Sequence, residues 1–349
     1  MRLIRNPMLW IGLAVSAGAL FLAFRGLRWA EVADGMAGAN YGLLLLALAI
    51  LPVAFYLRAL RWAVLFDSDK RMSTGSLFGA INIGYAFNNL LPLRLGDLPR
   101  AYVVRETENV SGAHALSTIV VERVLDTVTV VALLMVTLPF IEAPAWATGP
   151  AVFLGLGVLG LAAVLAILSA SRARVMPLVA WAVRFLPEFL REHTEQAVDS
   201  AIQGFTVLRR PTALVKAVAW SVASWVASAL VIFVALRAFD LDLGFKAALF
   251  IGSATSLGMV VPSSPGYIGV FHAIVIGSLV NVFDADRNQA ASFALVLHAM
   301  LYLTPIVIAG AFLWRERQVR RQVWLWVTSP TPAKTTVTAA GGSGGVLAE

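Results

Sequence analysis

The sequence Leu90-Leu91-Pro92-Leu93-Arg94-Leu95-Gly96-Asp97 returns in altered form as Val260-Val261-Pro262-Ser263-Ser264-Pro265-Gly266-Tyr267. Both have two apolar residues, a proline, three further residues, a glycine and one polar residue. Each follows about fifteen mostly apolar residues, fewer than the roughly 20 that a helix needs to cross a bilayer. Short hydrophobic segments interrupted by Gly and Pro, at matching positions of two halves, indicate a transporter binding site. The hinge residues that this predicts are Pro92, Gly96, Pro262, Pro265, Gly266 and Gly269.

The composition is that of a membrane protein. Hydrophobic residues make up 59% of the chain and charged residues only 13%, whereas soluble domains average roughly 25% charged residues. Several apolar runs are long enough to cross a membrane. We predict an all-α polytopic membrane protein with about 7–8 transmembrane helices, in which two Pro/Gly-broken or re-entrant segments are related by an internal repeat.

Several classes of site are excluded or disfavoured. The chain has no cysteine, so it has no disulfide, thiolate metal site or cysteine nucleophile. Its histidines lack metal-ligand spacing, and it has no phosphate-binding loop motif for ATP. We therefore expect no metal and no cofactor. The formal charge of +7 comes from Lys and Arg in loops, as in most membrane proteins, so we expect no nucleic-acid partner.

The apolar runs also predict the domain organisation. We expect a single transmembrane domain over residues 1–328, with repeat halves at about 1–170 and 211–328, and a disordered tail at 329–349. Residues 171–210 mix aromatic and basic residues, which is typical of helices lying in the membrane interface. The predicted spans are 8–24, 41–66, 113–138, 150–168, 213–236, 268–283 and 290–314, and the short segments are 77–93 and 245–261.

Lys and Arg predict the orientation. Arg2 and Arg5 place the N-terminus in the cytoplasm. If 245–261 re-enters the membrane, the basic cluster at 315–321 falls outside; if it spans, the cluster falls inside. The repeat favours the first alternative and the basic cluster favours the second. We expect a multi-pass protein of the cytoplasmic membrane with about eight crossings and both termini inside.

The strongest local signal is the run Glu122, Arg123, Val124, Leu125, Asp126. It begins about nine residues into a span, which is roughly 14 Å deep at 1.5 Å per residue. Each charge there costs about 2.5–3.5 kcal/mol on insertion scales, and charges inside a membrane are candidates for function. The alternative is an ion pair that only fixes helix packing.

The first short segment predicts a head-group site. Two adjacent amides, Asn88 and Asn89, need partners at membrane depth. Arg94 and Arg100 are candidates to bind a phosphate. Asp97 is a candidate to hold one of these arginines or to bind a substrate amine. The alternative is a cytoplasmic turn with ordinary loop arginines.

The second short segment has no charge. Ser263 or Ser264 can cap the following helix, whose N-terminus, near Tyr267, would attract an anionic head group. His272 either titrates there or is a hydrogen-bonded structural residue. We expect Arg58 and Arg61 to extend to the membrane surface, as basic side chains near helix ends do.

Three ordered motifs carry a resemblance to a known family. They are Asn88–Arg100, Glu122–Asp126 and the run from Val261 to Phe271. Together they resemble the flippase-like transmembrane family, found N-terminally in lysylphosphatidylglycerol synthases and alone in many bacterial and archaeal proteins. The resemblance covers about residues 5 to 325. Two positions depart from the family pattern. Asp97, after Gly96, keeps the acidic charge of the pattern but is shorter than Glu, and His272 stands where Glu is frequent.

The resemblance implies a protein that moves lipid head groups between leaflets. No aminoacyl-transferase domain follows in this sequence, so we expect a non-enzyme. The expected partners are membrane lipids, either an anionic phospholipid or a polyprenyl phosphate. Two alternatives remain open: an intramembrane lipid or glycosyl transferase with Glu122 or Asp97 as base, and a non-catalytic membrane partner of an envelope-lipid synthesis enzyme.

Overall fold

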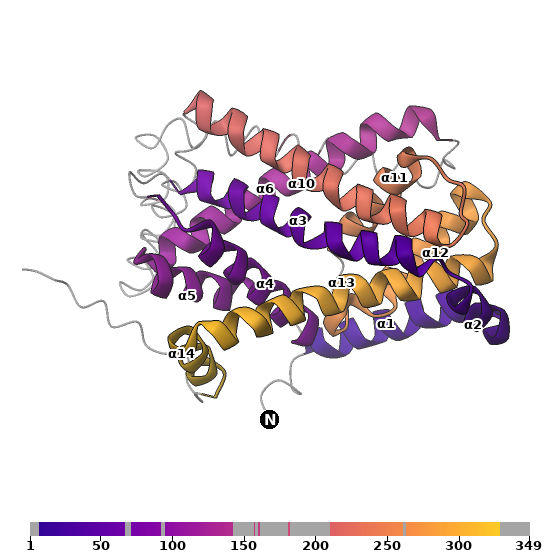
Figure 1. Ribbon diagram of the computed structural model, residues 1–349, viewed down its shortest axis with the longest axis horizontal. Helices are drawn as coiled ribbons and strands as arrows, with labels where there is room; N and C mark the ends of the chain where they lie inside the picture. The colour runs from indigo at the N-terminus through magenta and orange to yellow at the C-terminus, as the bar shows by residue number, and fades with distance from the viewer. Residues whose placement is uncertain are drawn as a thin grey trace, which may run out of the picture.

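The computed structural model describes residues 7–66, 71–91, 95–141, 210–260 and 263–328, and the isolated positions 157, 160 and 181. All regular structure in these ranges is helical (Figure 1). The expected span at 150–168, the interfacial region at 171–210 and the tail at 329–349 lie outside them. The helices are α1 (Pro7–Phe24), α2 (Trp29–Ala37), α3 (Tyr41–Leu65), α4 (Thr74–Leu90), α5 (Asp97–Glu108), α6 (Gly112–Thr137), η3 (Leu138–Phe140), α10 (Pro211–Ala238), α11 (Phe245–Gly258), η5 (Pro265–Tyr267), α12 (Val270–Phe283), α13 (Arg287–Arg315) and α14 (Arg317–Thr328).

The predicted apolar helices are confirmed within these ranges, and polar caps explain where several of them begin. The side chains of Asn40, Ser73, Ser111 and Asp286 accept backbone N–H groups in the first turns of α3, α4, α6 and α13. Helices α2, α5 and α14 were not predicted. Their sequences are short and rich in charges, so no apolar run reveals them.

The bundle has two ends, which Figure 1 shows at the left and right. We call them the α14 end and the α2 end. Helices α3 and α10 run antiparallel between them. Arg61 contacts Ser221 and Arg58 contacts Ser228, while the backbone N–H of Asn40 donates to the carbonyl of Ala238 at 2.7 Å. The C-terminus of α3 therefore lies at the α14 end and that of α10 at the α2 end.

Helices α4 and α5 form a hairpin that opens at the α14 end. Its open end is tied by the N–H of Ser73, which donates to Glu108 Oε2 at 3.1 Å. Near its tip, a Cβ on Gly96 would lie 2.0 Å from the carbonyl oxygen of Gly84. Only glycine allows this close approach of the two backbones, which explains the predicted hinge at Gly96.

Helices α11 and α12 form a second hairpin that opens at the α2 end. Phe250 packs against Phe283 with ring centroids 5.8 Å apart, and Gly258, at the end of α11, faces Ile274, near the start of α12. The tip contains Gly266 in the left-handed region, with φ 67°. The hairpin tips meet: a Cβ on Gly266 would lie 3.3 Å from the carbonyl oxygen of Asn89.

The two halves repeat with inverted direction. Helices α3, α4, α5 and α6 have 25, 17, 12 and 26 residues, and α10, α11, α12 and α13 have 28, 14, 14 and 29. Both returning limbs end in a left-handed residue, Asn109 and Asp284. Two residues later, Ser111 and Asp286 cap the next helix. The first hairpin opens at the α14 end and the second at the α2 end.

The structure adds one feature to the expected topology. Residues 268–283 were predicted to be a crossing, and Pro265–Phe283 is long and apolar enough for one. Helix α12 runs back to the α2 end beside α11. Helix α13 then carries the chain to the α14 end (Figure 1). Both short segments can therefore re-enter while the basic cluster after α13 stays on the side where α3 ends.

By length and hydropathy, four described helices can each cross a membrane: Tyr41–Leu65, Pro211–Ala238, Pro265–Phe283 and Arg287–Arg315. The pair Trp10–Phe24 and Trp29–Ala37, bent by 83°, can form a fifth crossing. Helix α6, with 26 residues, is equally long but carries three charges. The chain is thus a multi-pass membrane protein.

Candidate functional site

A cavity of about 410 Å³ lies where the two hairpin tips meet, within the roughly 300–1,000 Å³ typical of small-molecule sites. Both halves of the chain line it. Its apolar wall includes Val130, Leu133, Ile232 and Leu249. Its polar lining includes Arg58, Tyr85, Asn88, Asn89, Asp97, Arg123, Asp126, Ser228, His298 and Tyr302. The cavity thus offers charged and apolar surface to one ligand.

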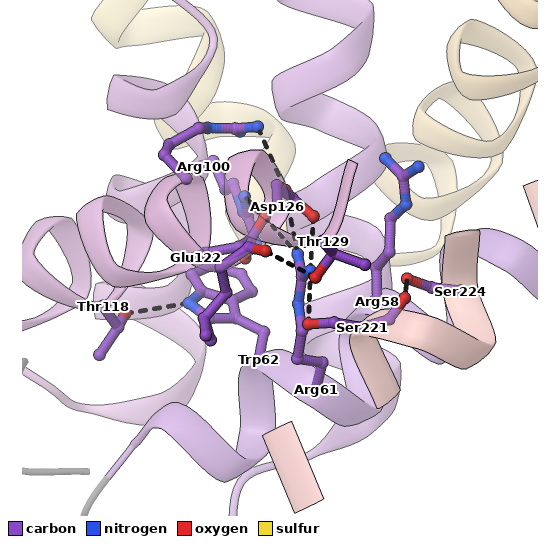
Figure 2. A network of polar contacts seen from close by, with 12 residues as sticks. Arg58, Arg61, Trp62, Arg100, Thr118, Glu122, Asp126, Thr129, Ser221 and Ser224 are labelled. Atoms are coloured by element: carbon purple, nitrogen blue, oxygen red, sulfur yellow. Dashed lines mark hydrogen bonds and ion pairs between the residues drawn. The ribbon is translucent and has the colours of Figure 1, made fainter. Parts of the chain in front are cut away.

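Two buried ion pairs join α3, α5 and α6 next to the cavity (Figure 2). Arg61 of α3 binds Asp126 of α6 with both terminal nitrogens, at 2.5 and 3.2 Å. Arg100 of α5 binds Glu122 of α6 in the same way, at 2.9 and 2.6 Å. A third contact of 3.3 Å joins Arg61 to Glu122. Bidentate pairing of this kind fixes geometry as well as charge, so the first hairpin is fastened to α3 and α6.

Aromatic and hydroxyl side chains complete this network. The guanidinium of Arg100 lies 3.7 Å from the ring centre of Trp62, a favourable cation–π contact. The indole N–H of Trp62 donates to Thr118 at 2.9 Å, and that of Trp225 donates to Asp126 at 3.1 Å. These contacts replace the hydration that buried charges lose.

A third ion pair faces the cavity. Arg123 donates to Asp97 at 3.0 Å and lies 3.8 Å from Asp126. The side chains of Arg123 and Asp97 are 42% and 36% exposed, whereas those of Glu122 and Arg100 are each 1% exposed. Of the charged run in α6, Arg123 is therefore the member that a ligand reaches most easily.

Arg58 also lines the cavity, from α3. Its terminal nitrogens donate to the hydroxyl of Tyr85 at 2.6 Å and to that of Ser228 at 3.3 Å. Its guanidinium lies 5.0 Å from the ring centre of Trp225. Figure 2 shows this group standing apart from the carboxylates. The expected extension to the membrane surface is wrong for Arg61, which has a fully buried side chain held by Asp126. Arg58 is only half-buried.

The amides of the first tip have structural partners. Asn88 Oδ1 accepts the N–H of Gly96 at 2.8 Å, which closes the turn between α4 and α5. Asn89 Nδ2 donates to the carbonyl of Tyr302 at 2.9 Å, which ties the tip to α13. Both residues still line the cavity.

The second tip differs from its predicted role. Gly269, with φ 95°, precedes α12, and neither Ser263 nor Ser264 caps that helix. The hydroxyl of Ser264 instead contacts the carbonyl of Ile268 at 3.1 Å. A Cβ on Gly269 would lie 2.3 Å from the carbonyl oxygen of Ser16 in α1. Because α1 packs directly on this turn, the start of α12 is closed to the expected anionic group.

The histidines form a pair next to this tip. His272 is 3% exposed, and its Nδ1 accepts the N–H of Gly269 at 3.4 Å. Its ring contacts that of His298 with centroids 4.7 Å apart, and His298 Nε2 lies 2.9 Å from the carbonyl oxygen of Gly266. His298, and not His272, lines the cavity with Tyr267 and Gly266.

The structure brings most predicted site residues together, in two layers. Asn88, Asn89, Asp97, Arg123, Asp126 and Tyr267 line the cavity, whereas Arg100 and Glu122 form the buried pair behind it. The expected phosphate-binding role of Arg100 does not fit this placement, because Glu122 occupies both of its terminal nitrogens. Pro92, Arg94 and Pro262 lie outside the described residues.

Sequence reasoning missed part of the wall. Tyr85, Trp225, Ser228, His298 and Tyr302 all line the cavity. On α10 a signal was present: Ser221, Ser224, Trp225 and Ser228 recur at the three- and four-residue spacing of one helix face. A polar stripe in an otherwise apolar helix marks the face that turns away from lipid.

The arrangement matches a described family. The family model of the lysylphosphatidylglycerol synthase TM region matches residues 9–310. The chain belongs to this family. The match spans both hairpins and every cavity residue named above, and it confirms the resemblance inferred from the motifs.

Two relatives extend the comparison. The chain is 26% identical over 336 residues to glycosyltransferase AglD of Haloferax volcanii, covering 88% of this chain and 54% of AglD. It is 28% identical over 268 residues to a UPF0104 membrane protein of Methanothermobacter thermautotrophicus, covering 70% of this chain and 77% of that protein. The chain therefore spans about half the length of AglD.

Proposed function

We propose that this protein moves lipid head groups across the cytoplasmic membrane. The observation that carries the proposal is the cavity between the hairpin tips, whose lining combines charged and apolar side chains. Irregular backbone at membrane depth is stable only against protein or a water-filled cavity. Short helices of inverted repeats that meet at such a site are the usual framework of transporters.

The distribution of charge supports an orientation. The described basic residues at the α14 end are Arg71, Arg105, Arg210, Lys216, Arg315, Arg317, Arg320 and Arg321, and the described acidic residues there are Glu106, Glu108 and Glu316. At the α2 end, Arg25, Arg28, Arg237, Lys246 and Arg287 are balanced by Glu31, Asp34, Asp240, Asp242, Asp284 and Asp286. Since basic loops stay in the cytoplasm, we place the α14 end, and with it the chain after α13, inside the cell.

The ion pairs suggest which of the two hairpins moves during transport. The first hairpin is fastened by Arg100–Glu122 and by Asp97–Arg123. The second contacts α1, α6 and α13 through apolar side chains and through neutral hydrogen bonds: the N–H of Ser264 donates to Ser16 Oγ at 2.7 Å, and His298 Nε2 lies 2.9 Å from the carbonyl oxygen of Gly266. Neutral hydrogen bonds are weaker than bidentate ion pairs, so the second tip can shift at lower cost. In the proposed cycle it moves past the head group while the first hairpin stays in place.

The test is a leaflet-exchange assay with purified protein in liposomes that contain fluorescent phospholipids. Dithionite bleaches only the outer leaflet, so bleaching beyond about half of the label reports exchange. We expect exchange with the wild type and a loss of exchange with Arg123→Gln. A wild-type signal equal to that of empty liposomes, for anionic and zwitterionic phospholipids and for a polyprenyl phosphate, would refute the proposal.

A second candidate function is a lipid or glycosyl transferase, which the name of the relative AglD favours. The half-exposed carboxylate of Asp97 would then be the base, and its ion pair with Arg123 would have to open for it to accept a proton. Mass spectrometry of the lipids recovered from the same liposomes, supplied with an activated sugar donor, separates the two. A lipid of altered mass that depends on Asp97 would favour the transferase.

A further inference from the structure

Arg58 differs from the other arginines of the site in its charge balance. Arg61, Arg100 and Arg123 each have a carboxylate within 4 Å. Within the described ranges Arg58 has none, and its hydrogen-bond acceptors are the two neutral hydroxyls of Tyr85 and Ser228. The polar lining therefore contains one cation that no described carboxylate contacts directly.

The carboxylates of the site are already committed. Asp126 accepts both terminal nitrogens of Arg61, and Glu122 accepts both of Arg100. Asp97 accepts Arg123. Because each described carboxylate around the cavity has its own arginine, a cationic amine entering the cavity finds no free counter-charge, whereas an anion finds Arg58.

The surroundings of Arg58 suit an oxyanion. A guanidinium has five N–H donors, and the Nε–H of Arg58 has no acceptor among the described residues. The hydroxyl of Tyr85 accepts a hydrogen bond from Arg58 and donates to no acceptor among the described residues, so it can donate a hydrogen bond to a ligand. Ser228, in contrast, already donates to the carbonyl of Ser224 at 2.8 Å. The rings of Trp225 and Tyr85 lie next to the guanidinium, with their centres 5.0 and 5.8 Å away.

We propose that Arg58, together with the hydroxyl of Tyr85, binds the phosphate group of an anionic phosphate ester in the cavity, in preference to a head group that carries a cationic amine. That the phosphate belongs to a lipid rests on the proposed function. The apolar residues that line the same cavity can contact the first atoms of an acyl or prenyl chain. The phosphate chemistry itself is shared with free inorganic phosphate.

The experiment measures binding to the detergent-solubilised protein by calorimetric titration. The probes are dioctanoyl phosphatidylglycerol, dioctanoyl phosphatidylethanolamine, dioctanoylglycerol and inorganic phosphate. We expect phosphatidylglycerol to bind more tightly than phosphatidylethanolamine, and dioctanoylglycerol, which lacks phosphate, not to bind. Inorganic phosphate is expected to compete with phosphatidylglycerol; a much weaker affinity identifies the lipid as the source, and an equal affinity identifies the free ion.

The variants assign the site. A charge-assisted hydrogen bond contributes about 1.5–3 kcal/mol, so Arg58→Gln should weaken phosphatidylglycerol binding about 10- to 100-fold. Tyr85→Phe, which removes a neutral donor, should weaken it roughly 2- to 10-fold, and Arg58→Lys should retain part of the affinity. The control Arg237→Gln changes an arginine that also contacts an aromatic ring, Phe233, but lies outside the cavity; its affinity should equal that of the wild type.

Two results would overturn the proposal: an Arg58→Gln protein with wild-type melting and unchanged phosphatidylglycerol affinity, or equal binding of dioctanoylglycerol. The leaflet-exchange assay keeps this inference separate from the proposed function. Exchange by the wild type together with Arg58-independent binding refutes only the phosphate site. Binding that depends on Arg58, without exchange of any lipid, supports the site and refutes the transport function.

Discussion

The buried pair of Arg100 and Glu122 gives the sharpest prediction for stability. Glu122→Gln removes the negative charge but keeps the size of the side chain. It leaves the guanidinium of Arg100, 1% exposed, without its bidentate partner. Arg61, whose guanidinium lies 3.3 Å from Glu122, also loses one of the two carboxylates that neutralise its charge. Breaking one side of a buried ion pair costs about 3–5 kcal/mol, a large part of the 5–15 kcal/mol that holds a typical protein folded.

The size of the effect depends on the uncompensated charge, and a double-mutant cycle isolates it. Arg100→Met removes the cation while its apolar stem continues to pack near Trp62. In Glu122→Gln/Arg100→Met no charge of this pair remains buried alone. We expect the double variant to be more stable than the sum of the two single effects predicts, with a coupling of about 1–3 kcal/mol.

The assay is SDS-induced unfolding in mixed micelles, followed by the helical circular dichroism signal. The control is Asp242→Asn, because Asp242 is 86% exposed in its pair with Arg237 and exposed pairs contribute at most about 1 kcal/mol. A Glu122→Gln protein within 1 kcal/mol of the wild type, or strictly additive single effects, would show that this pair does not fasten the first hairpin.

Two further predictions concern the second tip and the orientation. Gly266→Ala should destabilise the protein by about 1–3 kcal/mol and abolish leaflet exchange, because φ is 67° and the new Cβ would lie 2.4 Å from the ring of Tyr302. The control is Gly310→Ala on α13, which has open space around it and should be neutral or stabilising by up to about 1 kcal/mol. Equal melting temperatures of the two variants would contradict the tip geometry. In intact cells, an impermeant thiol reagent should label Asp242→Cys and spare Arg320→Cys, since we place the α2 end outside; the reverse pattern would invert the orientation.

Hydropathy predicted the long helices because each apolar run must be buried in lipid or in the bundle. It did not predict α5, whose sequence is polar and whose few apolar residues, such as Val103 and Val104, are buried by packing against neighbouring helices. Missing α5 also hid the partner of Glu122, since Arg100 lies on that helix. A pairing across 22 positions follows from the fold and not from local spacing.

The inverted repeat had a second signature that the Pro–Gly pattern alone did not exploit. Asn109-Val110-Ser111 and Asp284-Ala285-Asp286 both combine a left-handed residue with a helix cap two positions later. Both residue types favour these conformations, so the match was readable in the sequence. It would have shown that 268–283 runs back toward the start of α11, as α5 runs back toward the start of α4. The position of Arg58 beside Tyr85 and Ser228, in contrast, depends on the packing of three helices and could not be predicted from α3 alone.

Thiol labelling inside the cavity decides whether the hairpin tips enclose a water-filled path for head groups. The chain has no cysteine, so single variants are clean probes, and α10 offers a matched pair one turn apart. Ser228 lines the cavity, whereas Ser224 is fully buried. We predict that a methanethiosulfonate reagent labels Ser228→Cys, leaves Ser224→Cys unreacted, and that the label on residue 228 stops leaflet exchange. Equal protection of both thiols, or full exchange by the labelled protein, would contradict transport through this cavity.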